Sequence, residues 1–196
     1  TQTKVLGVDQ AAAIDSADIA SLSPQAVSGL SADAIGGLSQ SQTANFTSAQ
    51  IKALTTAQIA ALEVSDFAGF SSTQLVGLTA TQAKVLTGEQ LAAITASGFA
   101  GLTAPTVAGL SVDAVPSLTG AQMAVLTTAH VKALKPAQIE VMEVGDLSAL
   151  GADQKAAFTS AQIAVMSDEQ KSAIGLTPPL VVDLGEKGIA TLPIEA

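Results

Sequence analysis

The chain has 196 residues, of which 48% are hydrophobic and 13% are charged, so it is long enough and apolar enough to bury a sizeable core. The absence of Cys excludes disulfide scaffolds and thiolate zinc sites. Eight basic residues against 17 acidic ones leave a net charge of −9, and the only aromatic residues are five Phe. We therefore expect no nucleic-acid partner, because phosphates would be repelled and few rings could stack on bases.

One feature dominates the whole of 1–175. A large apolar residue, called the ladder residue below, recurs at every eighth position from Leu6 to Ile174, 22 times without an insertion. The residue after it is Ser or Thr in 15 of 22 cases, and the residue four after it is Gln in 12 of 21. The consensus is L-[ST]-x-x-Q-[IV]-x-small. Repetition at a fixed period is typical of solenoid proteins, so 1–175 is predicted to be one array.

The consensus predicts one short helix per octad. Ser or Thr followed three residues later by Gln is a capping box, and the apolar residues on either side of it match a hydrophobic staple. Pro24 and Pro136 fall at the first helical position, which tolerates Pro. Octads that end in Gly, such as those closed by Gly29, Gly37, Gly77 and Gly101, are expected to use a φ-permissive helix end, and a small last residue would let neighbouring turns approach closely.

Other architectures fit the octad poorly. In one continuous helix the ladder would spiral around every face, and a β-solenoid would favour alternating β-branched residues over Ala and Gln. A single octad cannot fold alone, because ordering eight residues costs about 12 kcal/mol, whereas burying two large apolar side chains returns about 3–6 kcal/mol. The prediction is an all-α solenoid or superhelix of about 21 stacked octads.

A longer period lies over the octad. IKALTTAQI at 51–59 matches VKALKPAQI at 131–139, 80 residues later. We interpret this as the duplication of a ten-octad block, giving blocks at about 6–85 and 86–165.

Membrane insertion and catalysis are not expected. The longest stretch without charge, Gln90 to Val112, contains regularly spaced Thr, three Gly and a Pro, and is interpreted as part of the array. No nucleotide-binding, hydrolase or metalloprotease motif occurs, so no catalytic and no cofactor-binding residue is assigned. The chain begins at Thr1 without a leader, which suggests a processed protein or a fragment.

Several residues replace Gln in its column. His130 is interpreted as a substituted capping partner, and Asp18, Asp66 and Asp146 as alternative cap acceptors, with calcium contacts left open for the Asp residues. In the octads of 94–117 the column holds Gly98, Thr106 and Ala114. This departure is either an exposed binding patch or a sign of tighter packing.

The octad stops after Ile174, and 176–196 is predicted to be an extended, β-like tail. Its segment TPPLVVDLGEKGIATL resembles the PLVLDLDGDGIET segment near the C-terminus of large secreted bacterial proteins of the repeats-in-toxin type and their adhesin relatives. The L-T-x-x-Q-I-x-A array also resembles those of very long bacterial surface proteins. The resemblance implies type I secretion, an extracellular or cell-surface location and calcium as a cofactor. Gly185, Glu186 and Lys187 replace the family's DGD, which leaves Asp183 and Glu186 as the only candidate calcium ligands.

The expected function is structural: an extracellular fibre subunit, adhesin stalk or spacer. Exposed end turns suggest head-to-tail self-association into filaments, and the apolar tail 180–193 could add to a neighbouring subunit. The competing hypothesis is a solenoid binding module that recognises a glycan, a peptide or a cell surface.

Overall fold

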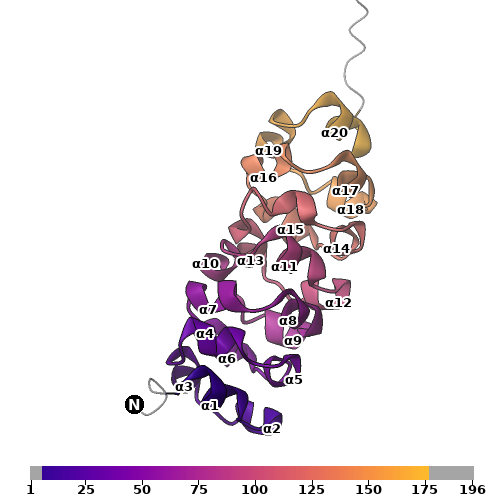
Figure 1. Ribbon diagram of the computed structural model, residues 1–196. Coiled ribbons are helices and arrows are strands. Elements are labelled where there is room, and N and C mark those ends of the chain that lie inside the picture. The colour runs from indigo at the N-terminus through magenta and orange to yellow at the C-terminus, as the bar shows by residue number, and fades with distance from the viewer. Residues whose placement is uncertain (1–5, 177–196) are drawn as a thin grey trace, which may run out of the picture.

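The computed structural model describes residues 6–176, which form a rod of stacked short helices (Figure 1). Each of the 21 octads from Leu6 onward carries one helix, and twenty of these are α-helices. They are α1 (Val8–Ala12), α2 (Ser16–Ile19), α3 (Pro24–Ser28), α4 (Ala32–Gly36), α5 (Gln40–Thr43), α6 (Ser48–Ala53), α7 (Thr56–Ala61), α8 (Val64–Gly69), α9 (Ser72–Leu75), α10 (Ala80–Ala83), α11 (Gly88–Ala93), α12 (Ala96–Phe99), α13 (Ala104–Gly109), the 3₁₀ helix η2 (Val115–Ser117), α14 (Gly120–Ala124), α15 (Thr128–Ala133), α16 (Pro136–Glu140), α17 (Val144–Ser148), α18 (Ala152–Lys155), α19 (Ser160–Ala164) and α20 (Asp168–Ala173).

Each α-helix begins directly after the residue that follows a ladder residue, which is the predicted cap position. In α7 the Thr55 hydroxyl accepts from the Gln58 backbone N–H at 3.2 Å, and the Gln58 side-chain oxygen accepts from the Thr55 N–H at 2.8 Å. The next ladder residue, Leu62, is extended, with φ −62° and ψ 141°, and this ends the helix after six residues. The capping box therefore fixes where a helix begins, and the following ladder residue fixes where this one stops.

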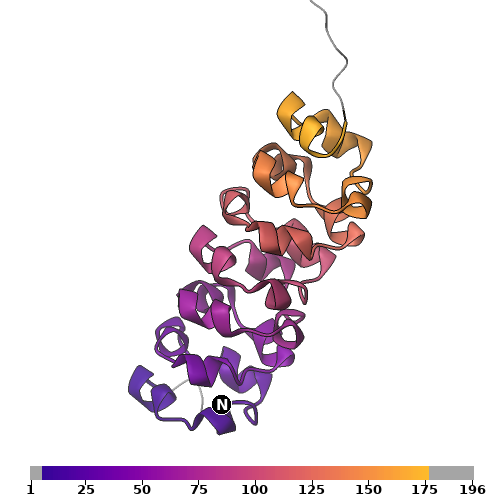
Figure 2. The same cartoon turned by 90° about the vertical axis from the view of Figure 1, so that its right-hand side faces the viewer.

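The helices wind into a superhelix. Each helix packs against the one three octads earlier, as in the pairs α1 with α4, α3 with α6 and α10 with α13. Across η2 the same rule holds, because α13 contacts α15 and α11 contacts η2. Figures 1 and 2 show the resulting elongated stack, with the N-terminal helices at one end and α20 at the other. The predicted all-α solenoid is confirmed.

The core consists of two columns of apolar side chains. Every ladder residue from Leu30 to Ile174 is buried, and so is the residue five positions after it in most octads, such as Ile51, Phe67 and Leu91. The first ladder residues, Leu6 among them, are only partly buried, because no described turn lies beneath them. The ladder is thus the continuous core that a lone octad lacks.

The glycines that end octads do not act as predicted. Gly29 and Gly37 have φ of −81° and −87°, and within residues 6–176 only Gly175 has a positive φ. The expectation of a φ-permissive helix end is therefore wrong for these octads. At Gly77 and Gly101 the reason is space, since an added Cβ would lie 2.1 Å from the carbonyl oxygens of Ser48 and Ser72 in the preceding turn.

The fourteenth octad differs from the rest because of Pro116. This residue lacks the N–H that an α-helix starting at Ser111 would need in its second turn. The backbone instead forms η2, and the Ala114 N–H still bonds the Ser111 hydroxyl at 3.2 Å. The pairing of helices three octads apart continues through this octad.

Two sequence predictions stand apart from the described fold. The tail, with Asp183 and Glu186, lies outside the described residues except for Leu176. The division into blocks 6–85 and 86–165 stays a prediction, because the stacking runs evenly past residue 85.

Candidate functional site

The most regular polar feature of the rod is a tie made by Gln between successive turns. The Gln50 side-chain oxygen accepts from the Thr47 N–H at 2.8 Å, which caps its own helix. Its side-chain nitrogen donates to the carbonyl oxygens of Ile19 at 2.7 Å and Leu22 at 2.8 Å, which lie 31 and 28 residues earlier. One buried amide therefore pairs with a backbone N–H at the start of its own helix and with backbone carbonyls of the preceding turn.

The same tie recurs along the array. Eleven glutamines donate to carbonyl oxygens of the preceding turn, and all are at most 8% exposed. They are Gln42, Gln50, Gln58, Gln74, Gln82, Gln90, Gln122, Gln138, Gln154, Gln162 and Gln170. Because the acceptors belong to octads three and four positions back, one superhelical turn holds between three and four octads. Sequence reasoning found the capping half of this role and missed the half that joins the turns.

His130 makes both bonds with an imidazole ring. Its Nδ1 accepts from the Thr127 N–H at 3.1 Å, and its Nε2 lies 2.9 Å from the Leu102 carbonyl oxygen, 28 residues earlier. This pattern requires the neutral Nε2–H tautomer. Burial lowers the pKa of His130, and the bond to the Leu102 carbonyl opposes that change. The predicted capping role is confirmed, and the ring also replaces the Gln amide between turns.

The three Asp residues of the Gln column differ from one another. The Asp66 carboxylate accepts from the Glu63 N–H at 2.9 Å and from the Thr43 hydroxyl at 2.7 Å, so its predicted capping role is confirmed. Burial raises the pKa of Asp66 despite these bonds. Asp146 is 8% exposed, and its pKa is raised by burial and then by the charge of Glu143. Its carboxylate makes no hydrogen bond within 6–176. Asp18 is exposed in the first turn, and its own carboxylate caps no helix, because the α2 cap is Asp15.

The residues considered for a binding patch are buried instead. Thr106 is 1% exposed, and its hydroxyl donates to the Leu78 carbonyl oxygen at 2.7 Å, again 28 residues earlier. A Cβ on Gly98 would lie 2.6 Å from the Phe70 carbonyl oxygen, and Ala114 is 2% exposed. These substitutions therefore reflect close packing between turns. The binding-patch interpretation of these three positions is wrong.

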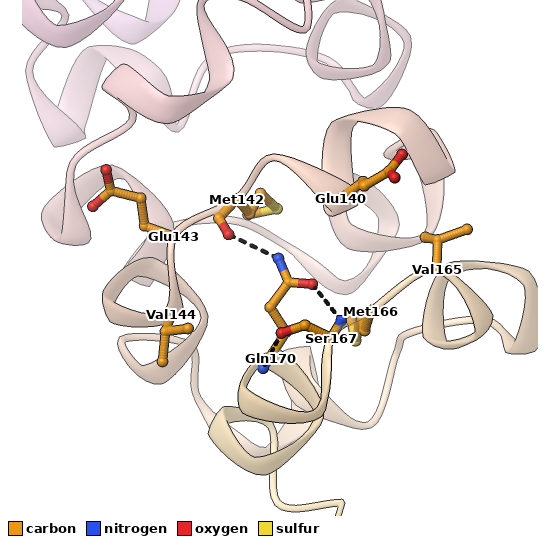
Figure 3. Close-up of a pocket in the computed structure, with 8 residues that line it drawn as sticks. All are labelled: Glu140, Met142, Glu143, Val144, Val165, Met166, Ser167 and Gln170. Atoms are coloured by element: carbon orange, nitrogen blue, oxygen red, sulfur yellow. Dashed lines mark hydrogen bonds between the residues drawn. The ribbon is translucent and has the colours of Figure 1, made fainter.

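The described surface is hollowed near its C-terminal end. A hollow of about 520 Å³ lies between the octads of α16, α17, α19 and α20, with Glu140 and Val165 on one side and Glu143 and Val144 on the other (Figure 3). Its floor is formed by Gln170, which joins the Met142 carbonyl to the Ser167 N–H. All four side chains of the rim are exposed. The floor atoms are already paired with each other, so the hollow is an open groove between turns.

Between residues 6 and 176, no three His, Asp or Glu side chains come together as a metal cluster. Nor does this range contain a helix with the length and apolarity needed to cross a bilayer. The stretch from Gln90 to Val112 is divided among α11, α12 and α13.

The comparison with protein families agrees with this geometry. The ALTTAQ repeat matches residues 11–48 and 59–96. The six letters of that repeat stand at 53–58, where they include a ladder residue, its cap and a Gln that joins two turns. Residues 97–174 lie outside the matched ranges but continue the array with one short helix per octad, and Gln ties recur there, as at Gln122 and Gln162. Neither the curated proteins nor the solved structures gave a match.

Proposed function

We propose that the protein is a structural spacer or stalk, a rigid rod that sets a distance between whatever its two ends carry. The observation that supports this is the series of side-chain ties from Gln42 to Gln170, made by eleven Gln together with Thr106 and His130, which joins each turn to the one before it. A solenoid in which every turn is bonded to its neighbour resists bending and shear. Between residues 6 and 176, the exposed side chains are mainly Ser, Thr, Ala and acidic residues, a polar surface that suits a spacer.

The proposed setting is the outside of a bacterial cell. The support is the resemblance of the array and of the segment 177–192 to secreted repeat proteins, together with an acidic composition that lacks Cys. Calcium remains part of this proposal, with Asp183 and Glu186 as its candidate ligands.

Head-to-tail self-association is a second candidate role. Leu6, Ile14 and Leu22 are partly buried at the first turn, and Leu176 is 41% exposed at the last described turn. Apolar residues at both ends favour contact between copies, and such a contact need not close into a ring. A binding module for a glycan or peptide is the third candidate, and only the open groove at Glu140 and Glu143 favours it.

Small-angle X-ray scattering of the purified chain, with and without calcium, tests the spacer. The expected result is the profile of a rod whose cross-section stays constant between low and high protein concentration. A profile of flexible segments would overturn the proposal. Electron microscopy of the same samples tests the second candidate, because filaments that lengthen with concentration are expected only if the ends associate.

A further inference from the structure

The C-terminal end of the described solenoid leaves an apolar cavity without a covering turn. The cavity has a volume of about 390 Å³, and Phe158, Ile163, Ile174 and Leu176 supply its apolar lining. Phe158 and Ile174, at 7% and 8%, are the most exposed ladder residues after the first three octads. In every earlier turn the ladder residues are covered by the turn that follows. This end of the solenoid can therefore accept one more layer.

That layer cannot be another octad of the same kind. The carbonyl oxygens of Leu150, Phe158 and Met166 follow Met142 in the series of ladder acceptors, and no described side chain donates to them. By the spacing of 28 residues seen at Gln170 and Met142, their donors would stand at 178, 186 and 194. These positions hold Pro178, Glu186 and Ile194, none of which has an amide side chain. The covering segment must therefore supply other donors, and backbone N–H groups are the ones that any segment carries.

We propose that residues 180–193 of the same chain bind in cis over this cavity and close the end of the solenoid. The chain passes Leu176 on the rim of the cavity, and only Thr177, Pro178 and Pro179 separate it from the segment LVVDL. So short a connection gives the segment a high effective concentration at the cavity. Leu180, Val181, Val182 and Leu184 match the apolar lining.

Charge also favours this segment. Lys155 is the one charged residue that lines the cavity. Residues 180–193 carry Asp183 and Glu186 against Lys187, so acidic groups are in excess. An extended segment here would place backbone N–H groups near the three ladder carbonyls and a carboxylate near the ammonium group.

A second copy of the chain fits this end less well. If a copy stacked its first turn on the cavity, its Gln column would have to reach the three ladder carbonyls. In that turn the column reads Gln10, Asp18 and Ala26, and only the first of these has an amide to donate. Closure by the tail therefore limits stacking at this end.

The absence of Cys allows a direct test in the full-length chain. A variant carrying Lys155→Cys and Val182→Cys, treated with a short bis-maleimide, is expected to form an internal crosslink whose yield does not change with protein concentration. The matched control is Lys84→Cys with Val182→Cys, because Lys84 is exposed in the middle of the rod. An internal crosslink in the first variant alone supports the proposal. Crosslinked dimers would overturn it in favour of a second copy, and equal yields in both variants would overturn it as well.

A second measurement covers the case in which the Cys variant is disturbed. Val182→Asp in the full chain is expected to speed hydrogen exchange in α18 and α20 about tenfold, because the covering layer is lost. Val76→Asp, at a side chain 51% exposed, is the control and should leave those helices unchanged. Unchanged exchange in Val182→Asp would contradict closure by the tail. Scattering of both variants reports on the rod separately, so failure of this proposal is distinguishable from failure of the spacer function.

Discussion

The side-chain nitrogen of Gln82 lies 2.7 Å from the carbonyl oxygen of Leu54, which precedes it by 28 residues. The oxygen of the same amide accepts from the Thr79 N–H at 2.8 Å. Both ends of one side chain are therefore used, one in its own helix and one in the turn beneath. Removing a buried amide that has all its partners costs more free energy than removing an exposed one, because several buried polar groups are left without a hydrogen bond.

Gln82→Ala is expected to destabilise the protein by about 2–4 kcal/mol, because the carbonyls of Leu54 and Ile51 and the N–H of Thr79 lose their partner. Urea unfolding followed by circular dichroism measures the change. Gln25→Ala is the control, since Gln25 is exposed and its side chain makes no tie. Equal stabilities of the two variants would show that the tie contributes nothing.

Gly101→Ala is expected to cost about 1–3 kcal/mol, because its Cβ would lie 2.1 Å from the Ser72 carbonyl oxygen and force the turns apart. Gly145→Ala provides the comparison. A Cβ there meets nothing within 4 Å, and Ala within a helix is favoured over Gly by about 1 kcal/mol. The two substitutions should therefore shift the thermal midpoint in opposite directions, and shifts of the same sign would refute the argument from close approach.

Stability is expected to fall on acidification because of His130. Its pKa in the folded chain is below the ordinary value of 6.5, so the unfolded chain binds the proton more tightly. The free energy of unfolding contributed by His130 is then complete above about pH 7.5 and decreases as the pH drops through 6.5. His130→Gln keeps both bonds without a titrating group. The free energy of unfolding of wild type should therefore fall relative to that of the variant as the pH is lowered from about 8 to 5. A difference between the two proteins that does not change with pH would contradict the prediction.

Asp146→Gln is expected to stabilise the protein by about 1 kcal/mol near neutral pH, because an amide can donate to the Leu118 carbonyl 28 residues earlier. The raised pKa of Asp146 means that its contribution is greatest below the unfolded value of 3.8 and is lost as the pH rises through the folded value. The advantage of Gln should therefore grow between about pH 3.5 and pH 6. Asp153→Asn, at an exposed position, is the control for the removal of a carboxylate, and a stability advantage of the Asp146→Gln variant that stays constant with pH would be inconsistent with this prediction.

Much of the rod could be predicted from the sequence because its rules are local. The cap at Thr55 and its partner Gln58 are three residues apart, so the octad alone reveals them. The bond from Gln58 to Leu30 joins residues 28 apart, and no pattern within one octad indicates that distance. The Gln column itself indicated a donor role, because Thr106 and His130, which replace Gln there, can both donate a hydrogen bond. The error at the octad-ending glycines has the same origin, since close approach to another turn is invisible to a local rule.

The ties also have a direction. The eleven Gln amides of these ties all reach toward the N-terminus, to carbonyls of residues that are synthesised earlier, whereas the Gln40 amide donates in the other direction, to the Ser65 carbonyl oxygen. A polypeptide made from its N-terminus can therefore complete each layer on a finished one, without waiting for residues still to come. Under a pulling force the order reverses. The last tied turn is held by Gln170, and within 6–176 no later Gln donates to its carbonyls. The rod should therefore unfold from that end, one superhelical turn at a time.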